Sequence, residues 1–161
     1  MQIRWLALSA PILVAGGCVT TPTTRIHSYW GATTNRPSQG ATFAWSLAAN
    51  PQSESGESHA LLPMIREQIE AGLVHSGYRK YEGKTGADFY VSSFFTQRIQ
   101  PSDYGPIDSG SLVIDVVSGV DGQRIWRGWA EGPVNPSLAP DARRKRIDNA
   151  VTQLLNQFKP A

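Results

Sequence analysis

The chain has 161 residues, which is about the length of one globular domain. Hydrophobic residues make up 40% and charged residues 17%, a balance that excludes a wholly disordered chain and a bundle of membrane-spanning helices. The formal net charge is only +2, which argues against an obligate nucleic-acid binder, although the isoelectric point is about 8.9. The single cysteine excludes a disulfide within the chain.

The first twenty residues, MQIRWLALSAPILVAGGCVT, have the pattern of an export signal. Arg4 precedes a short apolar stretch, which is well below the ~20 residues that span a bilayer, and small residues follow it. Cys18 comes directly after these small residues, and the arrangement resembles a bacterial lipobox. The resemblance implies cleavage before Cys18 and a lipid anchor on its sulfur, of the kind that palmitate labels.

This interpretation divides the chain into three parts. We expect a lipoprotein signal peptide at 1–17, a flexible tether at 18–24 and a single α/β domain at 25–161. By resemblance to the bacterial sorting rule, Val19 favours the outer membrane, and we expect the domain to face the periplasm. The alternative is an ordinary signal peptide with an incidental cysteine.

Two strands are predicted near the start of the domain. The segment RIHSYW (25–30) is a candidate first strand. The segment ATFAWSLA (41–48) is a strand because Phe43, Trp45 and Leu47 alternate with other residues, which is the period of an extended chain.

The segment 59–78 is predicted to be an amphipathic helix. Pro63 fits only the first turn of such a helix, and Gly77 is a suitable stop because it can adopt the left-handed conformation. Gly72 lies inside the helix and suggests a close approach to the sheet. Apolar side chains recur every three or four residues: Leu62, Ile65, Ile69 and Leu73.

The second half of the domain reads as three strands and a helix. Residues alternate along 87–100, and an Asp-Gly pair at 121–122 predicts a hairpin between strands 111–118 and 123–132. The final helix, 141–158, has a clear apolar stripe. The element order is therefore β(β)αβββα. We expect an α+β, two-layer sandwich in which both helices cover one face of a mainly antiparallel, four- to five-stranded sheet.

The hairpin also predicts which side chains share a face of the sheet. A simple register closed on the turn at 119–122 places Arg127 and Trp129 on the face that meets the helices, and Asp115 and Trp126 on the opposite face. Asp115 and Arg127 are then not expected to pair. An uncovered Trp126 face would be typical of a partner site, and cover by the segment 25–40 is the alternative. The candidate partner-binding residues are Trp126, Arg127, Trp129 and Asp115.

The run LVIDVVSGVDGQRIWRGWAEG (112–132) resembles the domain-of-unknown-function 4136 family of Gram-negative envelope lipoproteins. The resemblance implies an envelope lipoprotein with a small α/β domain, and it carries over no catalytic residue. The shared motifs are Phe43-Ala44-Trp45, Gly77-Tyr78 and Trp126-Arg127-Gly128-Trp129-Ala130.

The sequence contains no motif for catalysis or for a cofactor. It lacks a G-x-S-x-G nucleophile turn, a phosphate-binding loop and a dinucleotide fingerprint. The three histidines, His27, His59 and His75, lie in separate segments, so we expect no metal site. We therefore expect a protein that is not an enzyme and has no cofactor.

Four consecutive basic residues open the last predicted helix. They are poorly placed for the helix dipole, because positive side chains are unfavourable at a helix N-terminus. Contact with anionic lipid is one interpretation, and a solvated helix face is the other. These residues are Arg143, Arg144, Lys145 and Arg146.

Together these features predict a lipid-anchored, non-enzymatic module in the envelope. It would bind or help to assemble a protein partner, peptidoglycan or envelope lipid, and no nucleic acid is expected. The alternative is a carrier or chaperone for a small apolar ligand held between the sheet and the helices.

Overall fold

The computed structural model describes residues 24–31, 36–46, 56–83, 85–100, 107–133 and 138–161. The expected signal peptide and Cys18 lie outside these residues. The described chain forms the following elements: β1 (Arg25–Trp30), β2 (Thr42–Trp45), α1 (Gly56–His75), β3 (Arg79–Lys80), β4 (Phe89–Gln100), β5 (Ile107–Ser118), β6 (Arg124–Pro133) and α2 (Pro140–Leu155).

The described strands form one mixed sheet with the order β1-β6-β5-β4-β2-β3. The strands β1, β6, β5 and β4 pair with one another in an antiparallel arrangement, whereas β2 is parallel to both β4 and β3. The expected mainly antiparallel sheet of four or five strands, in the element order β(β)αβββα, is therefore corrected to six described strands in a mixed sheet, in the order ββαββββα. The parallel pairing follows from α1, because a chain that leaves β2 and returns through a helix re-enters the sheet in the same direction. The two-residue strand β3 is too short to show a periodicity.

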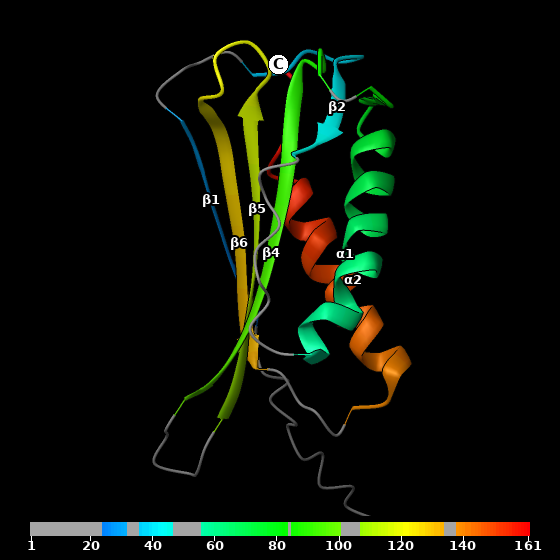
Figure 1. Cartoon of the computed structure of the whole chain (residues 1–161). Coiled ribbons are helices and arrows are strands. Elements are labelled where there is room, and N and C mark those ends of the chain that lie inside the picture. Colours follow the sequence, from blue (N-terminus) through cyan, green and yellow to red (C-terminus); the bar gives the residue numbers. More distant parts are fainter. Residues whose placement is uncertain (1–23, 32–35, 47–55, 84, 101–106, 134–137) are drawn as a thin grey trace, which may run out of the picture.

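Both helices lie on the same face of the sheet, as predicted (Figure 1). The helix α1 packs on β4 and β3, α2 packs on β6 and β1, and the two helices contact each other. The core between these layers is built from the alternate residues of the long strands and the apolar stripes of the helices. It includes Phe43, Ile65, Ile69, Leu73, Phe89, Val91, Ile114, Val116, Trp126, Val151, Leu154 and Phe158.

The start of α1 differs from the prediction and its end matches it. The helix begins at Gly56, so Pro63 lies in its interior and not in its first turn, where it leaves one helical hydrogen bond unmade. Gly77 ends the helix with φ +91°, and the amide of Tyr78 donates to the carbonyl of Leu73 at 3.1 Å. This is a Schellman cap, in which only glycine adopts the required conformation without strain.

Gly72 allows α1 to approach α2, not the sheet as the sequence suggests. A Cβ atom at this position would lie 2.4 Å from Cδ1 of Leu155. Leu155 is itself 5% exposed and belongs to the core. The glycine therefore sets the spacing between the two helices.

The predicted hairpin forms, but its register changes one residue beyond the turn. Val117 pairs with Arg124, as a simple register requires, whereas Val116 already pairs with Trp126. Ile125 is the extra residue of a β-bulge, and its carbonyl accepts a hydrogen bond from the amide of Gly31 at 2.7 Å. A one-residue shift exchanges the two faces of a strand, so every later side chain of β6 lies on the face opposite to the predicted one.

Candidate functional site

The face of the sheet that points away from the helices is called the outer face here. Neither described helix covers it (Figure 1). Its side chains come from the residues of β4, β5 and β6 that alternate with the core residues. The strand β1, which pairs with β6, adds further side chains to this face. They include His27, Tyr29, Tyr90, Ser92, Phe94, Val113, Asp115, Val117, Arg124, Arg127 and Trp129.

An ion pair that the sequence-based register excludes lies at the centre of the outer face. Arg127 is opposite Asp115 in the sheet. Its guanidinium donates two hydrogen bonds to the carboxylate, one from Nε at 2.6 Å and one from Nη2. The side chain of Asp115 is 8% exposed and that of Arg127 is 33% exposed. The hydrogen bonds to Asp115 raise the pKa of Arg127. The prediction that the two residues point to opposite sides is wrong because of the bulge.

A second arginine extends this network to the edge strand. Arg124 lies with its Nε 3.3 Å from Oδ1 of Asp115, and its Nη1 donates to the hydroxyl of Tyr29 at 2.6 Å. One buried carboxylate therefore holds two guanidinium groups, and the cluster keeps an excess of positive charge. It joins β1, β5 and β6 across the outer face.

Aromatic rings continue the cluster along β1 and β6. Trp129 stacks on His27 with ring centres 5.1 Å apart, and Tyr29 meets the edge of the same tryptophan at 6.2 Å. Tyr29 is 41% exposed. This face therefore carries tryptophan, tyrosine and arginine side chains side by side. These three residue types are enriched at energetically important positions of protein interfaces.

Trp126 lies on the opposite face from the one the sequence predicts. It is fully buried in the core and packs on Phe158, with ring centres 5.2 Å apart. Of the four candidate partner-binding residues, the structure brings Asp115, Arg127 and Trp129 together on the outer face. Trp126 supports them from beneath, as part of the core.

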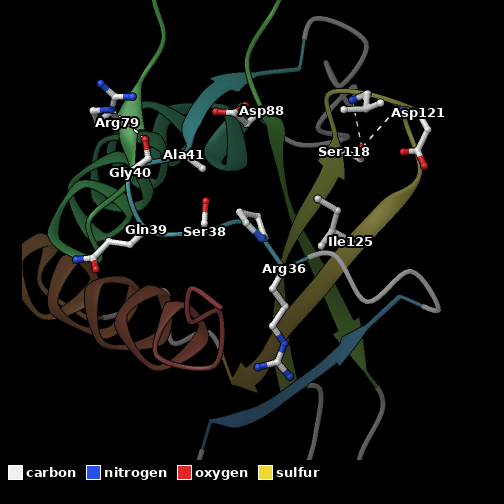
Figure 2. Close-up of a pocket in the computed structure, with 12 residues that line it drawn as sticks. Arg36, Ser38, Gln39, Gly40, Ala41, Arg79, Asp88, Ser118, Asp121 and Ile125 are labelled. Carbon is white, nitrogen blue, oxygen red and sulfur yellow. Dashed lines mark hydrogen bonds between the residues drawn. The ribbon is translucent and has the colours of Figure 1, made fainter.

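A polar pocket of about 610 Å³ lies at the end of the sheet where the β5–β6 turn and the start of β2 meet. Figure 2 shows Arg79 and Asp88 near one side of it and Asp121 with Ser118 near the other. Asp88 accepts hydrogen bonds from the amide and the hydroxyl of Thr42 at 2.6 and 2.7 Å, and these bonds lower its pKa. Asp88 thus ties the start of β2 to the start of β4, which gives it a structural role at the pocket wall.

The basic residues of α2 occupy its first turns, as predicted. Arg144, Lys145 and Arg146 are exposed and Arg143 is half-buried. An apolar groove of about 80 Å³ lies between this part of α2 and the sheet, and Arg146 lines it together with Thr24, the first described residue. The start of the domain and the basic run therefore lie at the same end of the molecule.

The remaining sites from the sequence give little further chemistry. Within the described residues, no group of three or more histidine, cysteine, aspartate or glutamate side chains could hold a metal ion. His27 is part of the aromatic cluster, and the side chain of His59 is outside the described residues. None of the helices described is long and apolar enough to cross a membrane.

Sequence reasoning missed the contributions of His27, Tyr29 and Arg124 to the outer-face cluster. The alternation of ring-bearing residues in RIHSYW, His27 and Tyr29 on one side of the strand and Trp30 on the other, is the available signal. The pairing of this strand with β6, about a hundred residues later, brings its rings to Trp129 and Arg127.

A family model for a domain of unknown function, DUF4136, matches residues 32–160, which is most of the chain and contains β2 to β6 and both helices. The protein belongs to the DUF4136 family. No curated protein matches the sequence. The motifs that carried the resemblance now have positions in this DUF4136 domain: Trp126 in the core, Arg127 and Trp129 on the outer face.

Solved structures align with this DUF4136 domain at low sequence identity, and two of those described next, with TM-scores of 0.61 and 0.50, share its fold. A PDZ domain protein from Parabacteroides distasonis aligns with a TM-score of 0.61 and 13% identity over 85% of this chain and 36% of its own. A variant of PelC from Paraburkholderia phytofirmans, solved as a dodecamer, aligns with a TM-score of 0.50 and 10% identity over 86% and 98% of the two chains. A minor lipoprotein from Acinetobacter baumannii gives a TM-score of 0.44 and 13% identity over 77% and 92%.

Proposed function

We propose that this protein is a lipid-anchored, non-enzymatic lipoprotein of the outer membrane that binds a partner protein in the periplasm through the outer face of its sheet. The sequence supports the anchor, because Cys18 follows a short export signal and is the chain's only cysteine. A lipid on Cys18 would hold the domain by a tether that ends at Thr24, where the described domain begins.

The cluster on the outer face is the observation that carries the binding role. Both helices cover the other face, and the outer face presents Trp129, Tyr29 and two arginines around one buried carboxylate. The bidentate pair and the stacked rings fix these side chains before any partner arrives, which reduces the entropy lost on binding. A rigid aromatic and cationic surface suits a protein partner with acidic and apolar residues.

The alternative, a carrier for a small apolar ligand between sheet and helices, requires a cavity in that layer. The groove between α2 and the sheet has a volume of about 80 Å³, whereas sites for small molecules occupy roughly 300–1,000 Å³. The larger pocket, of about 610 Å³, lies at the end of the sheet rather than between the sheet and the helices, and its lining mixes charged residues such as Arg79 and Asp88 with apolar ones such as Ile125. These dimensions favour the binding module over the carrier.

Site-specific photo-crosslinking in intact envelopes tests the binding face. A benzophenone amino acid replaces Tyr29 on the outer face, and the matched control replaces Tyr81, which is exposed to a similar extent (37%, against 41% for Tyr29) near the opposite edge of the sheet. We expect a discrete crosslinked protein from position 29 only, and loss of that product with Trp129→Ala. Identical products from both positions, or crosslinks to peptidoglycan alone, would contradict a protein partner on this face.

Labelling with radioactive palmitate tests the anchor separately. The parent chain is expected to incorporate label and Cys18→Ala is not. Equal labelling of the two chains would refute lipid attachment at Cys18 without bearing on the outer face.

A further inference from the structure

The end of the domain where the tether enters carries the basic run of α2. Thr24, which directly precedes β1, and Arg146 line the same groove, and Arg146 Nη1 lies 3.5 Å from the carbonyl of Pro133 at the end of β6. Figure 1 shows the start of α2 and the end of β6 at the same end of the sheet, with the β5–β6 turn at the other. The three-dimensional fold, rather than the sequence, brings these segments together.

The length of the tether limits the distance between this end and the membrane. Six peptide steps separate Cys18 from Thr24, and a fully extended chain covers about 3.3–3.6 Å per residue, so Thr24 stays within about 20 Å of a lipidated Cys18. Any shortening of the tether brings the start of α2 closer to the lipid headgroups. The attraction between cations and anionic headgroups acts over about 10 Å at ordinary ionic strength. The tether therefore keeps the cations of α2 at or near the distance at which they are attracted to the headgroups.

The charge of this end suits an anionic surface. Arg144, Lys145 and Arg146 are consecutive and exposed, and Asp141 and Asp148 are the acidic residues of the same helix. Arg144, Lys145 and Arg146 follow the first turn of α2, which carries Asp141, so the helix dipole gives no reason for cations at these positions. A basic cluster beside a membrane anchor gains its stabilisation from anionic headgroups.

The groove is too small to enclose a lipid chain. Its volume of about 80 Å³ is well below the roughly 300–1,000 Å³ of sites that enclose small molecules. Its lining is nevertheless informative, because it shows that Arg146 and Thr24 face a common space. The cations therefore meet lipid headgroups at the surface and not inside the domain.

We propose that the first turns of α2 dock on an anionic phospholipid surface, so that the domain stands with its tether end against the membrane and its β5–β6 turn pointing away. This inference rests on the proposed anchor at Cys18. It adds an orientation, in which the strands run roughly along the membrane normal. The outer face is then not turned toward the membrane and stays accessible to a partner.

Energy transfer from the lipidated full-length protein to acceptor-labelled lipid measures this orientation. The sulfur of Cys18 carries the lipid, so an introduced cysteine is the only free thiol. Ala139→Cys marks the exposed residue before α2, and Val120→Cys marks the opposite end, where the valine is 95% exposed. Each labelled protein is reconstituted in vesicles of phosphatidylcholine alone or of phosphatidylcholine with phosphatidylglycerol.

We expect stronger transfer from position 139 than from position 120 in the anionic vesicles, and a smaller difference in the neutral ones. Each exposed cation near the surface changes the ratio of docked to undocked protein about fivefold, so Arg144→Gln, Lys145→Gln and Arg146→Gln together lower it about a hundredfold. The control neutralises three exposed cations elsewhere, Arg79, Lys80 and Lys159, and is expected to leave the difference unchanged.

Different results would refute the docking of α2 and the anchor at Cys18. A protein that floats with both vesicles but shows equal transfer from both positions, or the same difference with and without phosphatidylglycerol, overturns the docking. A loss of the difference in the control as well as in the triple variant also overturns it, because the effect then follows net charge and not the start of α2. A protein that floats with neither vesicle refutes the anchor and, with it, the docked orientation.

Discussion

The pairing of Asp115 with Arg127 gives a direct thermodynamic test of the bulged register. The side chain of Asp115 is 8% exposed, and Asp115→Asn removes the negative charge that pairs with Arg127. Hydrogen bonds to charged groups contribute about 1.5–3 kcal/mol each, and the arginine side chain is one-third exposed, which reduces the contribution by solvent screening. We therefore expect the substitution to lower the free energy of unfolding by about 2 kcal/mol.

A double-mutant cycle isolates the pair from other effects of each substitution. Urea unfolding is measured for Asp115→Asn, Arg127→Met and the double variant, in a chain without residues 1–17 that carries Cys18→Ala throughout. The expected coupling energy is about 1.5 kcal/mol, because the second substitution costs little once the first has removed the contact. Arg124→Met is the matched control. Its Nε lies 3.3 Å from the carboxylate and its side chain is 43% exposed, so its coupling to Asp115 is expected to be smaller.

The unbulged register makes a different prediction for the same cycle. Asp115 and Arg127 would then lie on opposite faces of the sheet, and residues without contact couple by no more than about 0.5 kcal/mol. A coupling energy of this size would refute the assignment of both residues to the outer face.

Three further predictions address the core, the helix contact and the polar pocket. Trp126→Ala is expected to lower the free energy of unfolding by about 3–5 kcal/mol and Trp129→Ala by about 1 kcal/mol, since only the first leaves a cavity in the core; the reverse ranking in urea unfolding would contradict the face assignment. Gly72→Ala is expected to cost about 1 kcal/mol, because overpacking against Leu155 outweighs the gain in helix propensity, and thermal unfolding should show this cost disappear in a Leu155→Ala background. The lowered pKa of Asp88 implies stability that is fully present above its unfolded value of about 3.9 and is lost as the pH falls through the folded value. Asp88→Asn should therefore be less stable than the parent at neutral pH. A difference in the free energy of unfolding that does not shrink as the solution is acidified would contradict this cause.

Periodicity in the sequence predicts the helices and most strands because it reflects one-sided burial. The alternation in β4 places Phe89 and Val91 in the core, and the apolar stripe of α1 faces the same layer, as expected. The cap at Gly77 is predictable for the same local reason, since its conformation depends on a few neighbouring residues. Pro63 is the exception, because a helix that is held by tertiary packing tolerates an interior proline.

The candidate site depends on information that is not local. The carbonyl of Ile125, the extra residue of the bulge, accepts a hydrogen bond from the amide of Gly31, almost a hundred positions earlier. This single bulge decides whether Arg127 faces Asp115 or the core. The rings of β1 reach Trp129 only through the pairing of β1 with β6. Sequence reasoning therefore identified Asp115, Arg127 and Trp129 as unusual residues but assigned the wrong neighbours to them.

Oxidative footprinting of the outer face tests the proposed binding role most directly. Hydroxyl radicals modify exposed aromatic side chains, and the extent of modification is compared between intact envelopes and the purified protein. We expect Tyr29 and Trp129 to be protected in the envelope, while Tyr81, exposed to a similar extent as Tyr29, is modified equally in both samples. Equal modification of Tyr29 and Trp129 in envelopes and in the purified protein would contradict the proposed binding role.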